Sequence, residues 1–238
     1  MKISVCIATY NGEKYIKEQL NSILPQLKIG DEIIISDDGS TDNTIHIINT
    51  LNDDRIKIYM NTDINSVISN FNNALSYATG DIIFLSDQDD IWLDNKVKLC
   101  LKNLLNYDMI VTNCIVTDEK LNITHSSYFE MVNSGSGFIK NFYKSTYLGC
   151  CLAFNRKVLK TILPLPKELL MYHDWWIGFL AEIRFSVYFE RTPLLLYRRH
   201  GSTTSSTTLK SKNSFFVKIY SRLQLLYLGI VRLARDFK

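Results

Sequence analysis

Short apolar, β-branched runs alternate with segments of helical periodicity along the first hundred residues. The runs occupy residues 3–8, 32–36, 56–60 and 81–86. Between the first two runs, Ile16, Leu20 and Ile23 recur at steps of three and four, and residues 67–78 repeat that pattern before the fourth run. Such spacing places apolar side chains on one face of a helix. Strands that alternate with helices predict an α/β fold with a mostly parallel, Rossmann-like sheet covered by helices on both faces.

The pattern is less regular in the second half of the chain. A predicted helix containing Val97 and Leu101 leads into a strand-like run at residues 109–116. Residues 120–147 are polar with scattered aromatic residues, and we expect loops there. Strand- or helix-like pieces follow at residues 148–154, 175–181 and 185–189. We expect one domain at residues 1–205, built from a first half at about 1–116 and a second half at about 117–205.

Residues 206–238 are predicted to form a linker and an amphipathic C-terminal helix. Residues 201–214 are rich in Ser, Thr and Lys, which is typical of a linker or lid. Beyond them Phe216, Tyr220 and Leu223 begin an apolar stripe at helical spacing, with basic residues largely on the other side. A basic amphipathic helix suits a membrane surface with anionic lipid, and we favour that role over docking on the domain or on another subunit.

Charge is divided unevenly between the body and the tail. Residues 210–238 carry seven Lys or Arg and one acid, whereas residues 1–209 carry 20 Lys or Arg and 23 Asp or Glu. The mildly acidic body offers no basic groove, so we expect no nucleic-acid partner. The basic tail instead requires a negatively charged partner outside the core, such as an anionic membrane surface.

Cysteine usage and hydropathy indicate the compartment. The five cysteines include no C-x-x-C pair and no zinc-like spacing, which favours reduced, buried thiols. We see no secretory signal before the first strand and no apolar run of the about 20 residues that cross a bilayer. We therefore expect a cytoplasmic protein that is soluble or peripheral on the inner face of the cell membrane.

Polar clusters follow three of the predicted strands, at residues 9–13, 37–42 and 87–90. Ligands of parallel sheets bind beyond the carboxyl ends of the strands, so the three clusters are expected on one rim. D-D-G-S alone is ordinary turn chemistry. Three carboxylates within residues 87–90, however, repel one another without a basic neighbour, which predicts a cation. Such oxygen ligands suit Mg²⁺ or Mn²⁺ shared with substrate phosphates. Neither a Walker motif nor a Rossmann fingerprint is present.

Six short motifs, in order, resemble those of the family 2 glycosyltransferases of the GT-A fold. They are A-T-Y-N-G-E at 8–13, D-D-G-S-T-D at 37–42, S-D-Q-D-D-I-W at 86–92, G-C-C-L-A-F-N-R at 149–156, H-D-W-W at 173–176 and Y-R-R-H at 197–200. The resemblance covers about residues 1–205, and similar enzymes build bacterial surface polysaccharides. It implies a nucleotide-sugar half at 1–116 and an acceptor half at 117–205.

The resemblance implies roles for the residues of the first two clusters. Thr9, Tyr10 and Glu13 match the loop that holds the base and ribose of the donor. Asp38, with Asp37 beside it, is similar to the carboxylate that reads the edge of the base.

The resemblance also implies a metal site. Asp87-Gln88-Asp89 is similar to the D-x-D motif of the family, with Asp89 as the direct metal ligand and Asp87 near the metal and the donor's ribose or sugar. His200 resembles a late histidine that completes the shell of Mn²⁺ or Mg²⁺ or contacts the diphosphate, although it could also be a solvated basic residue. Arg198 or Arg199 would neutralise phosphate.

Asp174 matches the catalytic base of the family, at the start of a helix, where it takes the proton from the acceptor hydroxyl. The alternative is a purely structural role, in which the negative charge of Asp174 stabilises the N-terminal end of the helix dipole. The family usually has Glu-Asp at this point, so His173 departs from the pattern and its role stays open. Trp175 and Trp176 point to different helix faces; we expect one in the core and the other against an acceptor sugar, beside His173.

From these features we expect an inverting, metal-dependent hexosyltransferase. The expected donor is UDP-glucose or UDP-galactose, and the expected acceptor is a lipid-linked saccharide of the undecaprenyl-diphosphate type in O-antigen or capsule synthesis. A single displacement assisted by one base inverts the anomeric carbon. A dTDP-rhamnose-dependent rhamnosyltransferase is the alternative within the class. Alternatives of other classes are a non-catalytic nucleotide-sugar or carbohydrate-binding module and a metal-dependent phosphotransferase.

Overall fold

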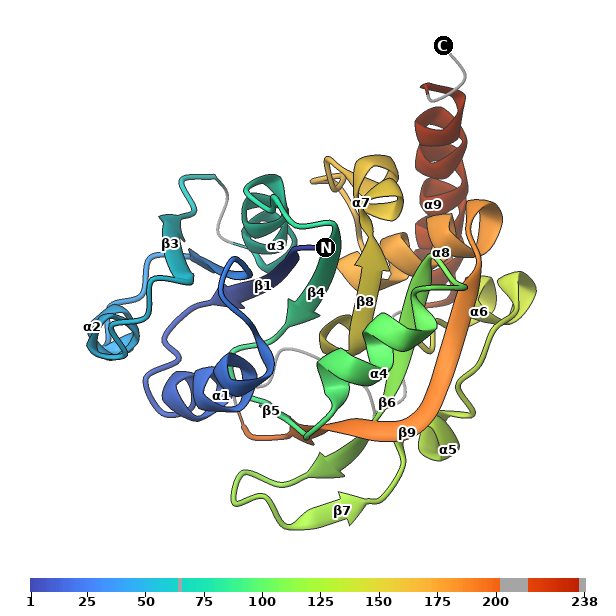
Figure 1. The fold of residues 1–238 in the computed structure, drawn as a ribbon. Helices are drawn as coiled ribbons and strands as arrows, with labels where there is room; N and C mark the ends of the chain where they lie inside the picture. Colours follow the sequence, from blue (N-terminus) through green and yellow to red (C-terminus); the bar gives the residue numbers. More distant parts are fainter. Residues whose placement is uncertain (64–65, 202–213, 236–238) are drawn as a thin grey trace.

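A computed structural model describes residues 1–63, 66–201 and 214–235 of the 238-residue chain. Within these residues, nine strands form one curled sheet in the order β3-β2-β1-β4-β8-β6-β9-β5, with β7 paired to β6 (Figure 1). The strands are β1 (Ile3–Thr9), β2 (Glu32–Asp37), β3 (Ile56–Met60), β4 (Ile82–Ser86), β5 (Ile91–Trp92), β6 (Met109–Thr117), β7 (Ile123–His125), β8 (Leu152–Asn155) and β9 (Val187–Arg198).

Helices cover both faces of the sheet. α8 packs against α3 and α7 on one face, while α1, α2 and α4 lie over the other (Figure 1). The helices are α1 (Ile16–Ile23), α2 (Thr44–Thr50), α3 (Val67–Ser76), α4 (Lys96–Asn103), α5 (Tyr128–Val132), α6 (Phe138–Tyr143), α7 (Arg156–Ile162), α8 (His173–Arg184) and α9 (Phe215–Arg235), with 3₁₀ turns η1 (Leu24–Gln26) and η2 (Gly149–Cys151).

The predicted fold class is confirmed. β1 pairs in parallel with β2 and β4, β2 with β3, and β6 with β9. The observed β1, β2, β3, β4 and β6 match the five predicted strands to within about a residue at each end. β8 interrupts the parallel order, because it runs antiparallel to both β4 and β6.

The prediction of loops at residues 120–147 is wrong in part, since β7, α5 and α6 lie there. α5 begins where the Ser127 hydroxyl accepts a hydrogen bond from the Glu130 amide. α7 was also missed, and it is capped by Asn155, whose side-chain oxygen accepts from the amides of Lys157 and Val158. α5 and α7 span only about two turns or less, so a capping side chain rather than a long periodic pattern marks where each begins.

The predicted C-terminal helix is confirmed as α9, and it docks on α8. Leu225 is fully buried, and Gly229 lies so close to Phe179 that a side chain there would collide with the ring. Residues 202–213 of the predicted linker lie outside the described residues, and the division at residue 205 stays a prediction. Among the residues that the structure describes, no helix combines the length and apolar character needed to cross a membrane.

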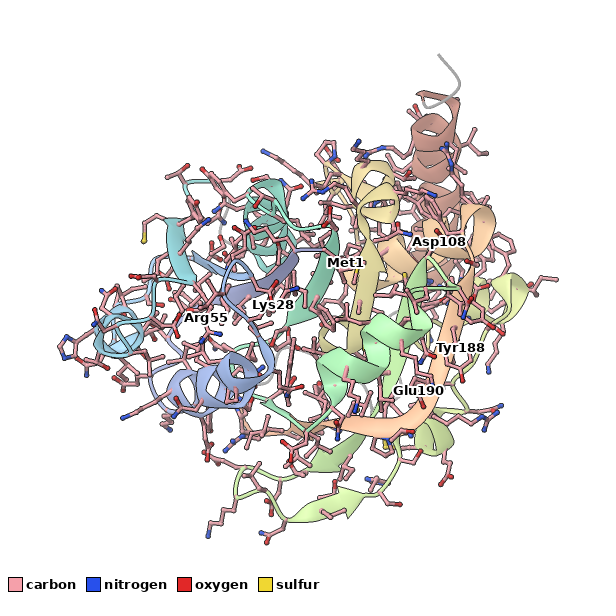
Figure 2. The ribbon with its side chains drawn as sticks, viewed as in Figure 1. Met1, Lys28, Arg55, Asp108, Tyr188 and Glu190 are labelled. Atoms are coloured by element: carbon pink, nitrogen blue, oxygen red, sulfur yellow. The ribbon has the colours of Figure 1, made fainter. Side chains whose placement is uncertain are left out.

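Long β9 returns the chain to the rim where the predicted polar clusters lie. Tyr188 and Glu190, near its start, lie beside α4 (Figure 2), where the Asn103 side-chain amide donates to the Glu190 carboxylate over 2.9 Å. The strand then bends along the sheet and pairs with β5, directly after the acidic cluster (Figure 1). Its carboxyl end thereby brings Arg198 to Asp90, whose Oδ1 accepts from the Arg198 amide over 3.0 Å.

Candidate active site

A cleft of about 1630 Å³ opens at the carboxyl ends of β1, β2 and β4. Its walls come from the loops after these strands, the start of α8, the end of β9 and one face of α9. The predicted site residues that line it are Thr9, Tyr10, Glu13, Asp38, Asp87, Asp89, His173, Asp174, Trp175 and His200. Side chains from five separate parts of the sequence therefore meet in one cavity, and three of these parts are the strand-end clusters that were expected on one rim.

Gln88 ties the loop after β4 to the loop after β1. Its side-chain oxygen accepts from the Tyr10 amide over 3.0 Å, and its side-chain nitrogen donates to the Tyr10 carbonyl over 3.1 Å. A side chain at Gly12 would collide with the Gln88 amide, so glycine leaves room for this clamp. The Tyr10 ring stays half exposed at the cleft. Gln88 was not predicted as a functional residue. Its position between the two aspartates of the D-x-D motif was the one feature of the sequence that could have indicated its role.

The two carboxylates after β2 have different surroundings. Asp37 does not line the cleft, which corrects its predicted donor contact: it is fully buried and accepts hydrogen bonds from the Gly39 and Ser40 amides and the Thr9 hydroxyl. It therefore shapes the turn. Asp38 faces the cleft and accepts from Asn61 over 2.7 Å, and burial raises the pKa of its carboxyl.

Asp87 and Asp89 face the cleft, whereas Asp90 lies behind it. Burial, followed by the charges of Asp89 and Asp174, raises the pKa of Asp87 to about 8. Asp90 is fully buried and, among the described residues, its Oδ2 has no hydrogen-bond partner. Crowded carboxylates of this kind gain stability from a cation, so the residues present fit a hard divalent ion such as Mg²⁺ or Mn²⁺.

Cys150 is a second neighbour of these acids. Its sulfur and carboxylate oxygens of Asp87 and Asp90 lie within 4.8 Å of one another. Burial raises the pKa of the Cys150 thiol well above its usual range. A protonated thiol is a poor ligand for a hard cation, so the cleft-facing oxygens of Asp87 and Asp89 suit Mg²⁺ or Mn²⁺ better.

Arg198 stands behind the cleft, which corrects its predicted phosphate contact. The guanidinium donates to the carbonyls of Asp89 and Glu119 and to the Glu18 carboxylate. Only 5% of the residue is exposed, so it braces the acidic loop instead of meeting a ligand. His200, two residues later, faces the cleft with Nε2 2.7 Å from Asp89 Oδ2.

Asp174 occupies the first turn of α8 and lines the cleft. Its Oδ1 accepts from the Trp175 amide over 2.7 Å, and burial raises the pKa of its carboxyl to about 7. A carboxylate with that pKa can exchange protons near neutral pH.

The two tryptophans divide as the sequence indicated. Trp175 lines the cleft and donates from Nε1 to the Asn141 carbonyl over 2.9 Å. Trp176 is fully buried and donates to the Ile162 carbonyl, so it takes the core position expected for one of the pair, and the predicted acceptor contact is left to Trp175.

His173 forms part of the cleft wall as a neutral ring. Its ring is tilted against that of Phe71, with the ring centres 4.1 Å apart, and Nε2 lies against Gly149, where an added Cβ would sit 2.6 Å away. Burial lowers the pKa of the imidazole to about 3, and neither ring nitrogen has a partner among the residues described.

Comparisons with known proteins agree with this architecture. The family model described as "Glycosyl transferase family 2" matches residues 4–163. RfbG of Shigella flexneri, a dTDP-rhamnosyl transferase, is 28% identical over 230 residues, which are 88% of this chain and 76% of RfbG. WfgD of Escherichia coli, a UDP-Glc:alpha-D-GlcNAc-diphosphoundecaprenol beta-1,3-glucosyltransferase, is 35% identical over 123 residues, which are 48% of this chain and 49% of WfgD.

Solved structures show the same GT-A fold. TarS 1–349 of S. aureus in complex with UDP-GlcNAc superposes with a TM-score of 0.73 at 22% identity, over 94% of this chain and 66% of TarS. The mannosyltransferase PcManGT from Pyrobaculum calidifontis, in complex with GDP-Man and Mn²⁺, gives a TM-score of 0.60 at 18% identity, over 99% of this chain and 65% of that chain. The present chain thus spans about two thirds of these structures and about half of WfgD.

Proposed function

The chain belongs to glycosyl transferase family 2, and on that premise we propose that it transfers a hexose, with inversion, from a nucleotide sugar to a lipid-diphosphate-linked saccharide. The proposed donor is UDP-glucose or UDP-galactose, and the proposed product is a surface polysaccharide such as O-antigen or capsule. The name of WfgD, which includes both UDP-glucose and diphosphoundecaprenol, supports this donor and acceptor class.

The observation that carries the proposal is the shared cleft of Asp174 and the acidic loop. Asp87, Asp89 and Asp174 line the same cavity, and the charge of Asp174 contributes to the raised pKa of Asp87. In the proposed reaction, ionised Asp174 accepts the proton of the acceptor hydroxyl, and the oxygen of that hydroxyl attacks the anomeric carbon of the donor sugar. The bond from that carbon to the donor diphosphate breaks, and the nucleoside diphosphate leaves with the bonding electrons. One base and one displacement give inversion.

Donor binding is assigned to the strand-end loops. Thr9, Tyr10, Glu13 and Asp38 would surround the base and ribose, and their positions along the cleft support this assignment. A divalent cation held by Asp87, Asp89 and His200 would supply positive charge to the leaving diphosphate. The similar structure of PcManGT contains Mn²⁺, which supports a divalent metal in this chain, and Mg²⁺ binds the same kind of oxygen ligands.

A dTDP-rhamnose donor is the second candidate. The match to RfbG, a dTDP-rhamnosyl transferase, extends over 88% of this chain, further than the match to WfgD. Uracil and thymine present the same polar edge, so the carboxylate of Asp38 would pair with either base.

We further propose that the protein sits on the inner face of the cell membrane through α9. Phe216, Tyr220, Leu223, Tyr227 and Ile230 are exposed and recur at steps of three and four, which places them on one outward face. Aromatic and aliphatic residues on one face of a helix suit a headgroup interface. The proposed contact differs from the sequence expectation, because Arg222 and Arg232 turn toward the protein and bind backbone carbonyls.

A donor screen tests the proposal. The purified chain would be incubated with UDP-glucose, UDP-galactose and dTDP-rhamnose, with and without EDTA, on a synthetic lipid-diphosphate-linked N-acetylglucosamine. Mass spectrometry of the product should show one added hexose that disappears with chelator. Phosphate transfer to the acceptor would indicate a phosphotransferase, and donor binding without any product would indicate a binding module.

A further inference from the structure

Three basic residues line the cleft that also contains Asp174. Lys218 and Arg222 come from α9, and Lys144 follows the end of α6. All three line the same cavity as Asp174 and Trp175. Because α9 supplies two of them, the C-terminal helix is part of the cleft wall and not only a docked appendage.

Arg222 joins the three segments. It donates from Nη1 to the Lys218 carbonyl over 2.7 Å and from Nη2 to the Tyr143 carbonyl, one residue before Lys144. Its guanidinium also lies 5.1 Å from the centre of the Trp175 ring. Since Trp175 directly follows Asp174 on α8, these contacts place the Arg222 guanidinium, together with the backbone of Lys218 and of the residue before Lys144, near the start of α8.

The three cations lack acidic partners within the described part of the chain. Its ion pairs link other residues, and the contacts of Arg222 are to carbonyls, a hydroxyl and an aromatic ring. Uncompensated cations that line a cavity attract an anion, and guanidinium and ammonium groups are the usual donors to phosphate.

We propose that Lys144, Lys218 and Arg222 bind the phosphate groups of the acceptor, an inference that rests on the proposed function and names residues for one of its substrates. The bound phosphate would hold the acceptor with its sugar hydroxyl toward Asp174.

The position of the cluster separates it from the donor diphosphate. Asp38, Asp87 and Asp89 belong to the strand-end loops, and a cation there would already neutralise the donor. Arg222 instead contacts Trp175 on α8, the helix that carries the candidate base, and it donates to the carbonyls of Lys218 and of Tyr143, which precedes Lys144. A cation for the donor diphosphate and basic side chains for the acceptor phosphate would suit a reaction in which both substrates carry phosphate.

The test is equilibrium binding by calorimetry, without donor and with EDTA, so that a metal-bridged diphosphate does not contribute. The probe is N-acetylglucosamine joined through diphosphate to a short alkyl chain, and its phosphate-free control is an alkyl N-acetylglucosaminide. The double variant Lys144→Gln/Lys218→Gln removes two charges and leaves the Arg222 contacts in place. The matched control is Lys98→Gln/Lys160→Gln, two exposed lysines outside the cleft.

The wild-type chain and the Lys98/Lys160 control should bind the diphosphate probe equally, and the Lys144/Lys218 variant should raise its Kd at least about tenfold. Affinity for the phosphate-free probe should not change. An unchanged Kd in the Lys144/Lys218 variant, or no binding of the diphosphate probe by the wild-type chain, overturns the proposal. Loss of binding to phosphatidylglycerol vesicles with an unchanged probe Kd would assign the cluster to lipid headgroups instead. None of these outcomes depends on turnover, so a failed transfer assay would count against the proposed function alone.

Discussion

The imidazole Nε2 of His200 lies 2.7 Å from Oδ2 of Asp89, although 111 positions separate the two residues. The His200 ring packs 4.7 Å from the ring of Tyr15, and the Arg198 guanidinium lies 4.9 Å from that same tyrosine ring. The carboxyl end of β9 is therefore held against the acidic loop by this hydrogen bond and by the packing of His200 and Arg198 around Tyr15. This arrangement keeps the His200 imidazole next to the carboxylates of the candidate metal site.

Replacing His200 by Ala should weaken the metal site without unfolding the protein. We expect the Mn²⁺ concentration for half-maximal transfer to rise about 10- to 100-fold, because a nitrogen that completes or orients the metal shell is lost. A metal titration of transfer activity measures the shift. His46→Ala, on an exposed face of α2, is the matched control and should leave the titration unchanged. An unchanged Mn²⁺ requirement in His200→Ala would remove His200 from the site.

The rate of transfer should rise with pH up to neutrality. Burial raises the pKa of Asp174 to about 7, and only the ionised carboxylate can accept a proton, so the reactive form is lost as pH falls below that value. A cation bound nearby favours the ionised form, which places the midpoint at or below about pH 7. Below the midpoint, kcat/KM should fall about tenfold per pH unit. A profile that is flat or decreasing between pH 5 and 8 would contradict this assignment.

Much of the frame could be predicted because buried parallel strands are continuous apolar runs, and polar residues after them mark the ligand rim. The position of Arg198 could not be predicted in that way. Its partners Glu18, Asp89 and Glu119 lie 180, 109 and 79 positions away, so no local pattern connects them. The side of α9 that packs on the domain could not be predicted either. Arg222 and Arg232 donate hydrogen bonds to backbone carbonyls, and the sequence does not show which carbonyls lie nearby.

His173 should make the protein less stable in acid. The native imidazole has a pKa lowered to about 3 by burial, whereas the unfolded chain takes up a proton near pH 6.5. Stability is therefore fully present above pH 6.5 and decreases as pH falls toward the native pKa. Between pH 7.5 and 5 the loss is about 2 kcal/mol.

The check on His173 is urea unfolding at several pH values for the wild type and for His173→Phe, which cannot titrate. The difference in unfolding free energy between the two proteins should shift by that amount in favour of the variant at the lower pH. A constant difference would show that the native ring also takes up the proton, and so that it is not sealed from water.

The outward face of α9 should bind lipid. Leu223→Asp/Tyr227→Asp places two charges on the exposed apolar stripe, so flotation with vesicles containing phosphatidylglycerol should decrease severalfold while secondary structure by circular dichroism is retained. The matched control is Ile29→Asp/Leu105→Asp, which changes two other exposed apolar residues. Equal flotation of all three proteins would assign the stripe to another partner.

The proposed mechanism depends on Asp174 as the base that takes the proton from the acceptor hydroxyl. Asp174→Asn keeps the size of the side chain and removes the group that accepts the proton, and exposed Asp94→Asn is its control. The most direct measurement is transfer from the preferred nucleotide sugar by each variant, alongside calorimetric binding of the nucleoside diphosphate with Mn²⁺. Asp174→Asn should lose about 10²- to 10⁴-fold in kcat with nucleotide binding retained. Transfer by Asp174→Asn at the wild-type rate would contradict the proposed mechanism.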